Sequence, residues 1–268
     1  HWLCDEGRYC FHALTEGERV AAPMIRQEAG LAPADWDTAI RAVLSHLRGA
    51  ENLAGLLSGR NTNEEAFLFA KLMKKLSPQS ALEVFYQERE LSEVAKILMS
   101  PDRSPNFRGA HEMGVRLDGG FASWLHQLIA GRFSSAYVVG EDLAKLSGDG
   151  DRIEKALSRL SFLVVQDTHL TPTARLAHVV LPATHFGEKE GTYTNRKGRI
   201  QKLNPALVRP EGALHDWEIF AHLLNELGEP ISCGNPGEIF RQLAAEVPRY
   251  RNLTYETLGE QGYQPENP

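Results

Sequence analysis

Short apolar runs along the chain alternate with longer stretches in which apolar residues recur at helical spacing. The runs are predicted to be strands and cover residues 53–57, 82–86, 136–139, 162–165 and 178–181. The last three are continuous rather than alternating, which is typical of strands that helices cover on both faces of a parallel sheet. Strands that alternate with helices predict βαβ units and hence a layered α/β architecture.

Helix-start signals fit between these runs. Asp35 is placed to cap a helix that ends at Gly49, and Thr62 with Glu65 has the spacing of a capping box. Asp216 is expected to cap a later helix. Besides the first two, helices are predicted over residues 120–130, 152–160, 217–227 and 237–246.

The two ends of the chain differ from this middle part. Residues 1–33 lack clear periodicity and are predicted to form a partly irregular segment packed on the body. Residues 191–203 predict a hairpin with Lys197-Gly198 as its turn, and the polar stretch after Pro248 predicts an extended arm. We therefore divide the chain into an N-terminal segment (1–33), an α/β domain (34–248) and a tail (249–268).

Composition narrows the classes of function. The 268 residues carry a formal net charge of −6, and this mild acidity argues against nucleic-acid binding. No apolar run approaches the ~18–20 residues of a membrane span. The three cysteines, Cys4, Cys10 and Cys233, are too few for a disulfide scaffold and favour a reducing compartment. The chain opens with His1 rather than an initiator Met, so we expect the later part of a longer polypeptide.

Candidate chemistry follows the predicted parallel strands. Three of them are followed by candidate loops, which are Gly140-Glu141-Asp142, Gln166-Asp167-Thr168-His169 and Pro182-Ala183-Thr184-His185. Open α/β sheets bind ligands at the carboxyl ends of their strands, so Glu141 or Asp167 could accept hydrogen bonds from a ribose or a purine edge. Loops that are simply polar are the alternative. The chain has no P-loop, dinucleotide fingerprint or nucleophile elbow, and we assign no catalytic residue.

A second candidate is the predicted hairpin, where Arg196, Lys197 and Arg199 lie beside Asn195. These donors could contact a phosphate or a heterocycle, or they could form a solvated hairpin tip. Taken by itself, the pattern favours the solvated tip.

Four stretches of the chain, taken in order, resemble segments of one family. The longest is AHVVLPATHFGEKEGTYTN (177–195), and the others are WLCDEGRY (2–9), PNFRGAHEMG (105–114) and FLVVQDTHLTPTA (162–174). The family is the molybdopterin oxidoreductase superfamily, which includes formate dehydrogenases and the large iron–sulfur subunit of bacterial NADH:quinone oxidoreductase, respiratory complex I. The resemblance implies a shortened parallel-sheet α/β domain of the formate dehydrogenase-like type.

The resemblance also implies a metal chemistry from which this chain departs. Active members hold molybdenum or tungsten through a selenocysteine, Cys, Ser or Asp in the loop after the early strand–helix unit. Here that unit covers residues 53–77, and residues 78–103 contain no cysteine. We therefore predict that the fold is retained, that the molybdenum chemistry is lost and that molybdopterin guanine dinucleotide is absent. The chain would then most resemble the C-terminal domain of the large iron–sulfur subunit of complex I.

Two sets of site residues follow from the resemblance. Cys4 matches the last ligand of a family [4Fe–4S] cluster whose other ligands lie upstream, so residues 1–33 would flank that cluster; a buried structural cysteine is the alternative. Other positions match residues that contact the guanosine or pterin parts of the cofactor in active relatives, and they are expected to be vestigial here. They are Gly140, Glu141, Asp142, Gln166, Asp167 and Asn195.

The first functional hypothesis is a non-catalytic scaffold and electron-transfer domain of complex I. Its partners would be other subunits of the soluble arm, in the cytoplasm and peripheral to the inner membrane, with no nucleic acid and no membrane span of its own. The alternative is a fragment of a molybdenum- or tungsten-dependent formate dehydrogenase-type oxidoreductase that binds a bis-pterin guanine dinucleotide. A third possibility is a stand-alone partner-binding module with no redox role.

Overall fold

Seven strands form one sheet at the centre of the described part of the protein. The computed structural model describes residues 8–9, 11–12, 16–86, 90–97, 99, 102, 104–146, 148–231 and 233–265. The strand order in the sheet is β2-β1-β7-β6-β5-β3-β4, and β8 and β9 form a separate two-stranded sheet. The strands are β1 (Met24–Gln27), β2 (Gly30–Pro33), β3 (Leu53–Leu57), β4 (Ala81–Val84), β5 (Ser135–Val139), β6 (Phe162–Asp167), β7 (Val179–Pro182), β8 (Gly191–Thr194) and β9 (Ile200–Leu203).

The strands β3 to β7 run parallel to one another. Every residue of β3, β5, β6 and β7 is buried, which is what the continuous apolar runs predict for strands covered on both faces. The predicted α/β class with a parallel sheet is therefore confirmed.

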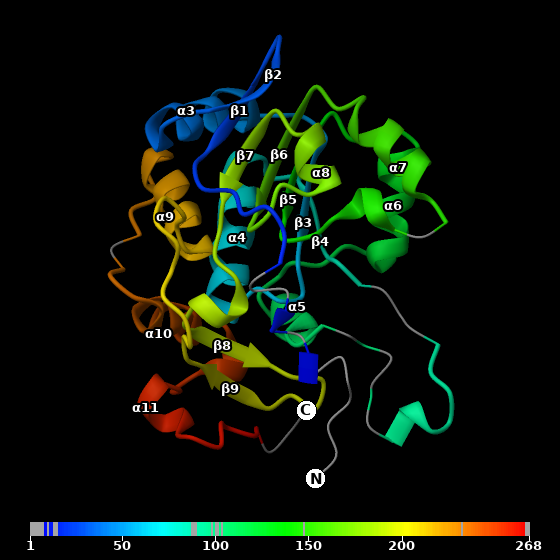
Figure 1. Ribbon diagram of the computed structural model, residues 1–268. Coiled ribbons are helices and arrows are strands. Elements are labelled where there is room, and N and C mark those ends of the chain that lie inside the picture. The colour runs from blue at the N-terminus through cyan, green and yellow to red at the C-terminus, as the bar shows by residue number, and fades with distance from the viewer. Residues whose placement is uncertain are drawn as a thin grey trace.

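Helices cover both faces of this sheet, so the protein has three layers (Figure 1). Along β5, Tyr137 and Val139 belong to one hydrophobic core and Ala136 and Val138 to the other, because side chains alternate along a strand. The first core includes side chains from α3 (Trp36–Leu47), α4 (Asn63–Leu76), α5 (Phe107–Glu112), α9 (Asp216–Glu226) and α10 (Pro236–Glu246). The second includes side chains from α6 (Gly120–Ile129), α7 (Gly150–Leu157) and α8 (Pro172–Leu176).

Capping residues determine where several helices begin. The Asp35 carboxylate accepts a hydrogen bond from the Thr38 N–H at 2.8 Å, and the capping box of Thr62 and Glu65 is present, so both predictions are confirmed. The predicted cap of α9 is wrong. The helix is capped at His215, whose backbone N–H donates to the carboxylate three residues on, and Asp216 is the first helical residue. Its side chain is thereby free to turn into the protein.

The ends of the described chain contain more regular structure than the sequence indicates. β1 and β2 form an antiparallel hairpin, and β1 also pairs with β7. The hairpin predicted over residues 191–203 is confirmed as β8 and β9. The tail begins in η4 (Pro248–Tyr250), continues through α11 (Tyr255–Leu258) and pairs through Tyr263 with Ile200, rather than running as an extended arm.

The order of the parallel strands creates a reversal between β3 and β5. From β3 the chain passes through α4 to β4 on one side, then returns to β5 on the other side and continues through β6 to β7. At such a reversal the loops after the two adjacent strands lead in opposite directions and leave a crevice at the carboxyl ends. Among the described residues, no helix is both long and apolar enough to cross a membrane.

Candidate functional site

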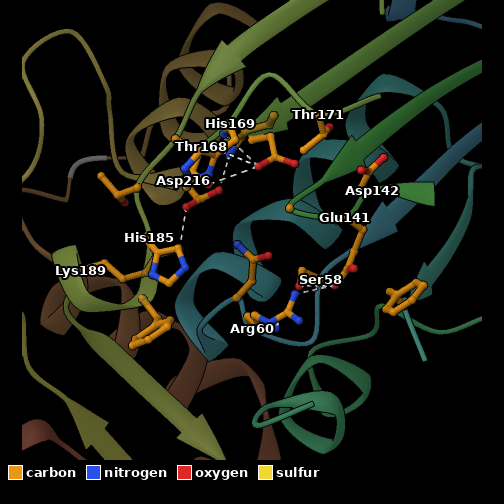
Figure 2. A pocket seen from close by; sticks show the side chains of 18 of the residues that line it. Ser58, Arg60, Glu141, Asp142, Thr168, His169, Thr171, His185, Lys189 and Asp216 are labelled. Atoms are coloured by element: carbon orange, nitrogen blue, oxygen red, sulfur yellow. Dashed lines mark hydrogen bonds and ion pairs between the residues drawn. The ribbon is translucent and has the colours of Figure 1, made fainter. Parts of the chain in front are cut away.

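A cavity of about 700 Å³ lies at the carboxyl ends of β3, β5, β6 and β7, where the strand order reverses. Figure 2 shows Ser58 and Glu141 on one side of it and His185 and Lys189 on the other. Five of the six residues predicted to match cofactor contacts line this cavity. They are Gly140, Glu141, Asp142, Gln166 and Asp167.

Two carboxyl groups on the cavity wall, those of Glu141 and Asp167, are nearly buried. Glu141 accepts a hydrogen bond from the Ser58 hydroxyl at 2.5 Å, and Asp167 accepts from the backbone N–H groups of Thr168 at 2.6 Å and His169 at 3.2 Å. Burial raises the pKa of Glu141 to about 7 and that of Asp167 to about 6. Both groups therefore change protonation near neutral pH, and each can accept or donate a hydrogen bond there.

Three buried polar atoms on the cavity-lining residues have no hydrogen-bond partner among the described residues. They are Asp142 Oδ2, His169 Nε2 and His185 Nδ1. The other carboxylate oxygen of Asp142 accepts from the Thr173 hydroxyl at 2.7 Å, and Lys145 Nζ lies 3.6 Å from Oδ2. Buried polar atoms are almost always hydrogen-bonded in folded proteins, so three such atoms on the residues of one cavity make it a candidate site for a polar ligand.

The floor of the cavity is a buried network of ion pairs and hydrogen bonds. The ammonium of Lys189 is buried, 3.1 Å from a Glu65 oxygen and 2.7 Å from Asp216. Asp216 also accepts from the Gln166 side-chain amide at 2.7 Å, and Gln166 accepts from the Tyr137 hydroxyl at 2.5 Å. Burial by itself would lower the pKa of Lys189, but the two carboxylates outweigh it and raise that pKa above its ordinary value. We call Lys189, Glu65, Asp216 and Gln166 the floor network.

Gly140 allows the loops after β3 and β5 to approach each other. Its φ of +68° lies in the left-handed region that glycine adopts at low cost, and its N–H donates to the Gln166 carbonyl at 2.8 Å. A side chain at this position would bring a Cβ atom within 3.1 Å of Ser58 Cβ. The glycine therefore keeps this side of the cavity narrow and its backbone accessible.

Asn195 is the predicted residue that does not line the cavity. Its side-chain oxygen accepts hydrogen bonds from the backbone N–H groups of Lys197 at 2.9 Å and Arg199 at 3.1 Å, inside the turn between β8 and β9. Here the side chain stabilises the hairpin turn. The cofactor roles assigned to all six residues from the resemblance stay predictions.

The family-like stretch around Asn106 does not line the cavity but hydrogen-bonds to a loop that does. The Asn106 amide donates to the carbonyl of Asn61, a cavity residue, at 2.8 Å, and its oxygen accepts from the Thr194 N–H at 2.6 Å. Gly109 has no room for a side chain, because a Cβ atom there would lie 2.0 Å from Asn63 Oδ1. This motif therefore fixes the position of the loop after β3 rather than contacting a ligand itself.

Several lining residues were missed by the sequence analysis. Ser58 and Arg60 directly follow the strand over 53–57, so the rule that places ligands after parallel strands could have found them. Lys189 lies within the 177–195 stretch that resembles the family, whereas His185 belongs to a loop that the sequence analysis had already proposed. The sequence does not indicate that Asp216 lines the cavity, because an Asp at the start of a helix is expected to cap that helix.

The cysteines contribute nothing to this cavity in the described part of the chain. Cys4 and Cys10 lie outside the described residues, so Cys4 as a [4Fe–4S] ligand stays a prediction. Cys233 precedes α10 and accepts a contact from the Gln242 amide at 3.1 Å. Within the described ranges, no group of three or more His, Cys, Asp or Glu residues is arranged to hold a metal ion.

One family model matches part of the chain. Residues 106–226 match the family model of molybdopterin oxidoreductase, and these residues include β5, β6, β7 and most of the cavity wall. Together with the parallel sheet, this match supports a molybdopterin oxidoreductase-type domain in this part of the chain.

Curated relatives of the matched region are formate dehydrogenases by name. The chain is 42% identical over 139 residues to the F420-dependent formate dehydrogenase 2 subunit alpha of Methanococcus maripaludis, covering 49% of this chain and 21% of the relative. It is 42% identical over 124 residues to the F420-dependent formate dehydrogenase subunit alpha of Methanocaldococcus jannaschii, covering 46% and 18%. It is 38% identical over 149 residues to a putative formate dehydrogenase of Bacillus subtilis, covering 54% and 15%.

The aligned region is a small part of these relatives. It spans between 15% and 21% of the length of the three proteins, so their whole activities do not transfer to this chain directly. None of the three is a complex I subunit. Among solved structures, acetylene hydratase from Pelobacter acetylenicus aligns with 53% of this chain and 20% of its own, at 16% identity and a TM-score of 0.42, and nothing further rests on that likeness.

Proposed function

We propose that this chain is the nucleotide-binding part of a formate dehydrogenase-type oxidoreductase and that its cavity holds the guanosine end of a molybdopterin guanine dinucleotide. The observation that carries the proposal is the cavity at the strand reversal, three of whose lining residues carry a buried polar atom without a hydrogen-bond partner among the described residues. The names of the curated relatives support this alternative over the complex I hypothesis. The proposal therefore replaces the expectations of a passive scaffold and an absent cofactor.

The residues present fit a guanine nucleotide. The edge of guanine presents N–H donors beside a carbonyl acceptor. Asp142, Asp167 and Glu141 supply carboxylate acceptors for such donors, while His169 and His185 can donate to acceptors. The cavity volume lies within the range of about 300–1,000 Å³ that is usual for ligand sites.

Charged side chains at the cavity suit the phosphate part of the ligand. Arg60 and Lys145 line the cavity with 61% and 71% of their side chains exposed, which leaves both cations accessible to an incoming anion. When bound, the pterin group carries the metal that supplies the redox chemistry. The residues of this chain would bind and orient the nucleotide and exclude water from its base. Cys4 as a cluster ligand, the partner subunits and the location of the protein stay predictions.

Guanosine diphosphate (GDP) is the probe that tests this proposal. We expect isothermal titration of the 268-residue chain with GDP to show binding, and adenosine diphosphate to bind at least tenfold more weakly. Asp167→Asn removes one wall carboxylate and should weaken GDP binding about tenfold, while the matched change Asp151→Asn, at an exposed position in α7, should not. Absence of GDP binding at millimolar concentration, or equal binding of the two nucleotides, would contradict the proposal.

A further inference from the structure

A short segment before the sheet, residues 16–20, runs along the cavity wall; we call it the strap. Its residue Arg19 forms an antiparallel bridge with His169. The Val20 N–H donates to the Thr168 carbonyl, and the Leu170 N–H donates to the Glu18 carbonyl, both at 3.1 Å. The strap is therefore paired with the loop that follows β6, and this loop supplies Thr168 and His169 to the cavity.

The side chain of Arg19 reaches the loop that follows β7. Its two terminal nitrogens donate to the two carboxylate oxygens of Glu188, each at 2.9 Å. The pair is largely buried, with 22% of the Arg19 side chain and 5% of the Glu188 side chain exposed. Two parallel charge-assisted hydrogen bonds fix both the distance and the angle between their partners, which a single ion pair does not.

Glu188 passes this constraint to a cavity residue. One of its oxygens also accepts the backbone N–H of His185 at 2.8 Å, in the turn η3 (Phe186–Glu188). β6 and β7 pair only as far as Asp167 and Pro182. Beyond that register, Arg19 joins the loop bearing His169 to the loop bearing His185. Each of these two histidines has one ring nitrogen without a hydrogen-bond partner in the described part of the chain, Nε2 of His169 and Nδ1 of His185.

We propose that Arg19 is a positioning residue of this cavity: paired with Glu188, it holds the two loops at the separation that a bound nucleotide requires. The proposal rests on the proposed function, because it assigns the residue that sets the geometry of the same site. Arg19 does not line the cavity, so its effect passes through His169 and His185.

The positive charge of Arg19 also affects the two histidines, because it lowers the pKa of both. Burial, and after it the nearby guanidinium, lowers the pKa of His169. Burial and nearby cations that include Arg19 outweigh the Glu188 carboxylate and lower the pKa of His185 to about 4. Both imidazoles are therefore neutral at pH 7. A neutral imidazole offers one donor and one acceptor, which is the form that can match a base edge on either side.

The first experiment measures the loops without any ligand. Amide hydrogen exchange is compared between the wild-type chain, Arg19→Gln and the matched control Arg175→Gln, whose ion pair with Glu18 involves side chains that are 56% and 69% exposed. We expect Arg19→Gln to speed exchange at Leu170 and Glu188 at least tenfold, and Arg175→Gln to leave it unchanged. Unchanged exchange in Arg19→Gln would overturn the proposal whether or not a nucleotide binds.

The second experiment measures coupling through GDP affinity. Arg19→Gln and Glu188→Gln should each weaken binding about tenfold, and the double variant should weaken it about tenfold as well, because both remove the same pair. Arg19→Lys keeps the charge but cannot form the bidentate pair of hydrogen bonds, so its loss of GDP affinity should be intermediate. A hundredfold loss in the double variant, or unchanged affinity in Arg19→Gln with a folded protein, would overturn the proposal.

These two arms separate failure of the positioning role from failure of the proposed function. If the wild-type chain does not bind GDP, the proposed function fails, and the exchange experiment still decides whether Arg19 holds the two loops. Circular dichroism and the thermal midpoint show whether each variant is folded. If Arg19→Gln does not fold, Arg19→Lys replaces it in the exchange experiment, with faster exchange expected at the same two amides.

Discussion

The floor and the wall of the cavity use the same kinds of residue for different purposes. On the floor, the two carboxylates of Glu65 and Asp216 share the Lys189 ammonium, and Gln166 continues the network to Tyr137. On the wall, by contrast, Asp142 and two imidazoles keep buried atoms without hydrogen-bond partners among the described residues. Buried charges that pair with one another hold the structure together, whereas the unpartnered polar atoms on cavity residues mark the place that we propose for the ligand.

The comparison predicts that a change on the floor damages stability and a change on the wall damages binding. The two regions are adjacent, and Gln166 belongs to both, since it lines the cavity and donates to Asp216. Removing a floor charge leaves its partners buried and unpaired. Replacing a wall carboxyl by a neutral side chain removes the free-energy cost of burying that group.

The largest expected effect is that of Lys189→Met on the floor. Two buried carboxylates would lose their shared cation, and we expect the free energy of unfolding to fall by about 3–5 kcal/mol in urea titrations. The matched change Lys197→Met, on the exposed hairpin turn, should stay within about 0.5 kcal/mol of wild type. A loss below about 1 kcal/mol for Lys189→Met would mean that the ammonium is not what holds the floor network together.

The next effect concerns the pH dependence of stability and the wall residue Glu141. Because burial raises its pKa from 4.5 to about 7, the folded state favours the protonated form, and stability is lost as pH rises from about 4.5 through 7. The loss is on the order of 2–3 kcal/mol. Glu141→Gln, which is neutral at every pH, should flatten this part of the curve.

The measurement for Glu141 is the free energy of unfolding at pH 5 and at pH 7.5 in both proteins. Relative to wild type, Glu141→Gln should be more stable at pH 7.5 than at pH 5. Glu226→Gln, at an exposed position in α9, serves as the control and should follow the wild-type curve. Parallel curves for wild type and Glu141→Gln would show that this carboxyl is solvated in the protein.

The smallest expected effect belongs to Asn195, which lies outside the cavity. Asn195→Ala removes two hydrogen bonds to backbone N–H groups in an exposed turn, so unfolding should become easier by about 1 kcal/mol. GDP affinity should stay the same, because the side chain does not line the site. Weaker GDP binding in a variant of normal stability would return Asn195 to the group of ligand contacts.

Much of the fold was predictable because its signals are local. The continuous apolar runs identify β3, β5, β6 and β7, and the capping residues at 35 and 62 identify the starts of α3 and α4. β1 and β2 were missed because each has only four residues and none of these is fully buried. What places them in the sheet is pairing with β7, about 150 residues further along, and no local pattern records that.

The site was predictable only where topology decides it. Loops after parallel strands converge at one edge of a sheet, and this rule located Glu141, Asp142 and Asp167. The floor network joins residues from positions 65, 189 and 216, and local sequence does not bring these together. The choice of complex I within the family depended on a missing cysteine between residues 78 and 103. The absence of a cysteine from one segment says little about a nucleotide site built from others.

The pairing of β1 with β7 has a practical consequence for preparing pieces of this protein. Met24 and Ile25 pair with Val180 and Val179, and the Arg26 N–H donates to the His178 carbonyl at 2.8 Å. A piece that starts at residue 34 lacks β1, so the apolar inner strand β7 becomes an exposed edge strand of the sheet. Exposed edge strands pair with strands of other molecules and cause aggregation. An expressed piece intended to stay monomeric therefore has to retain residues 24–33 together with β7.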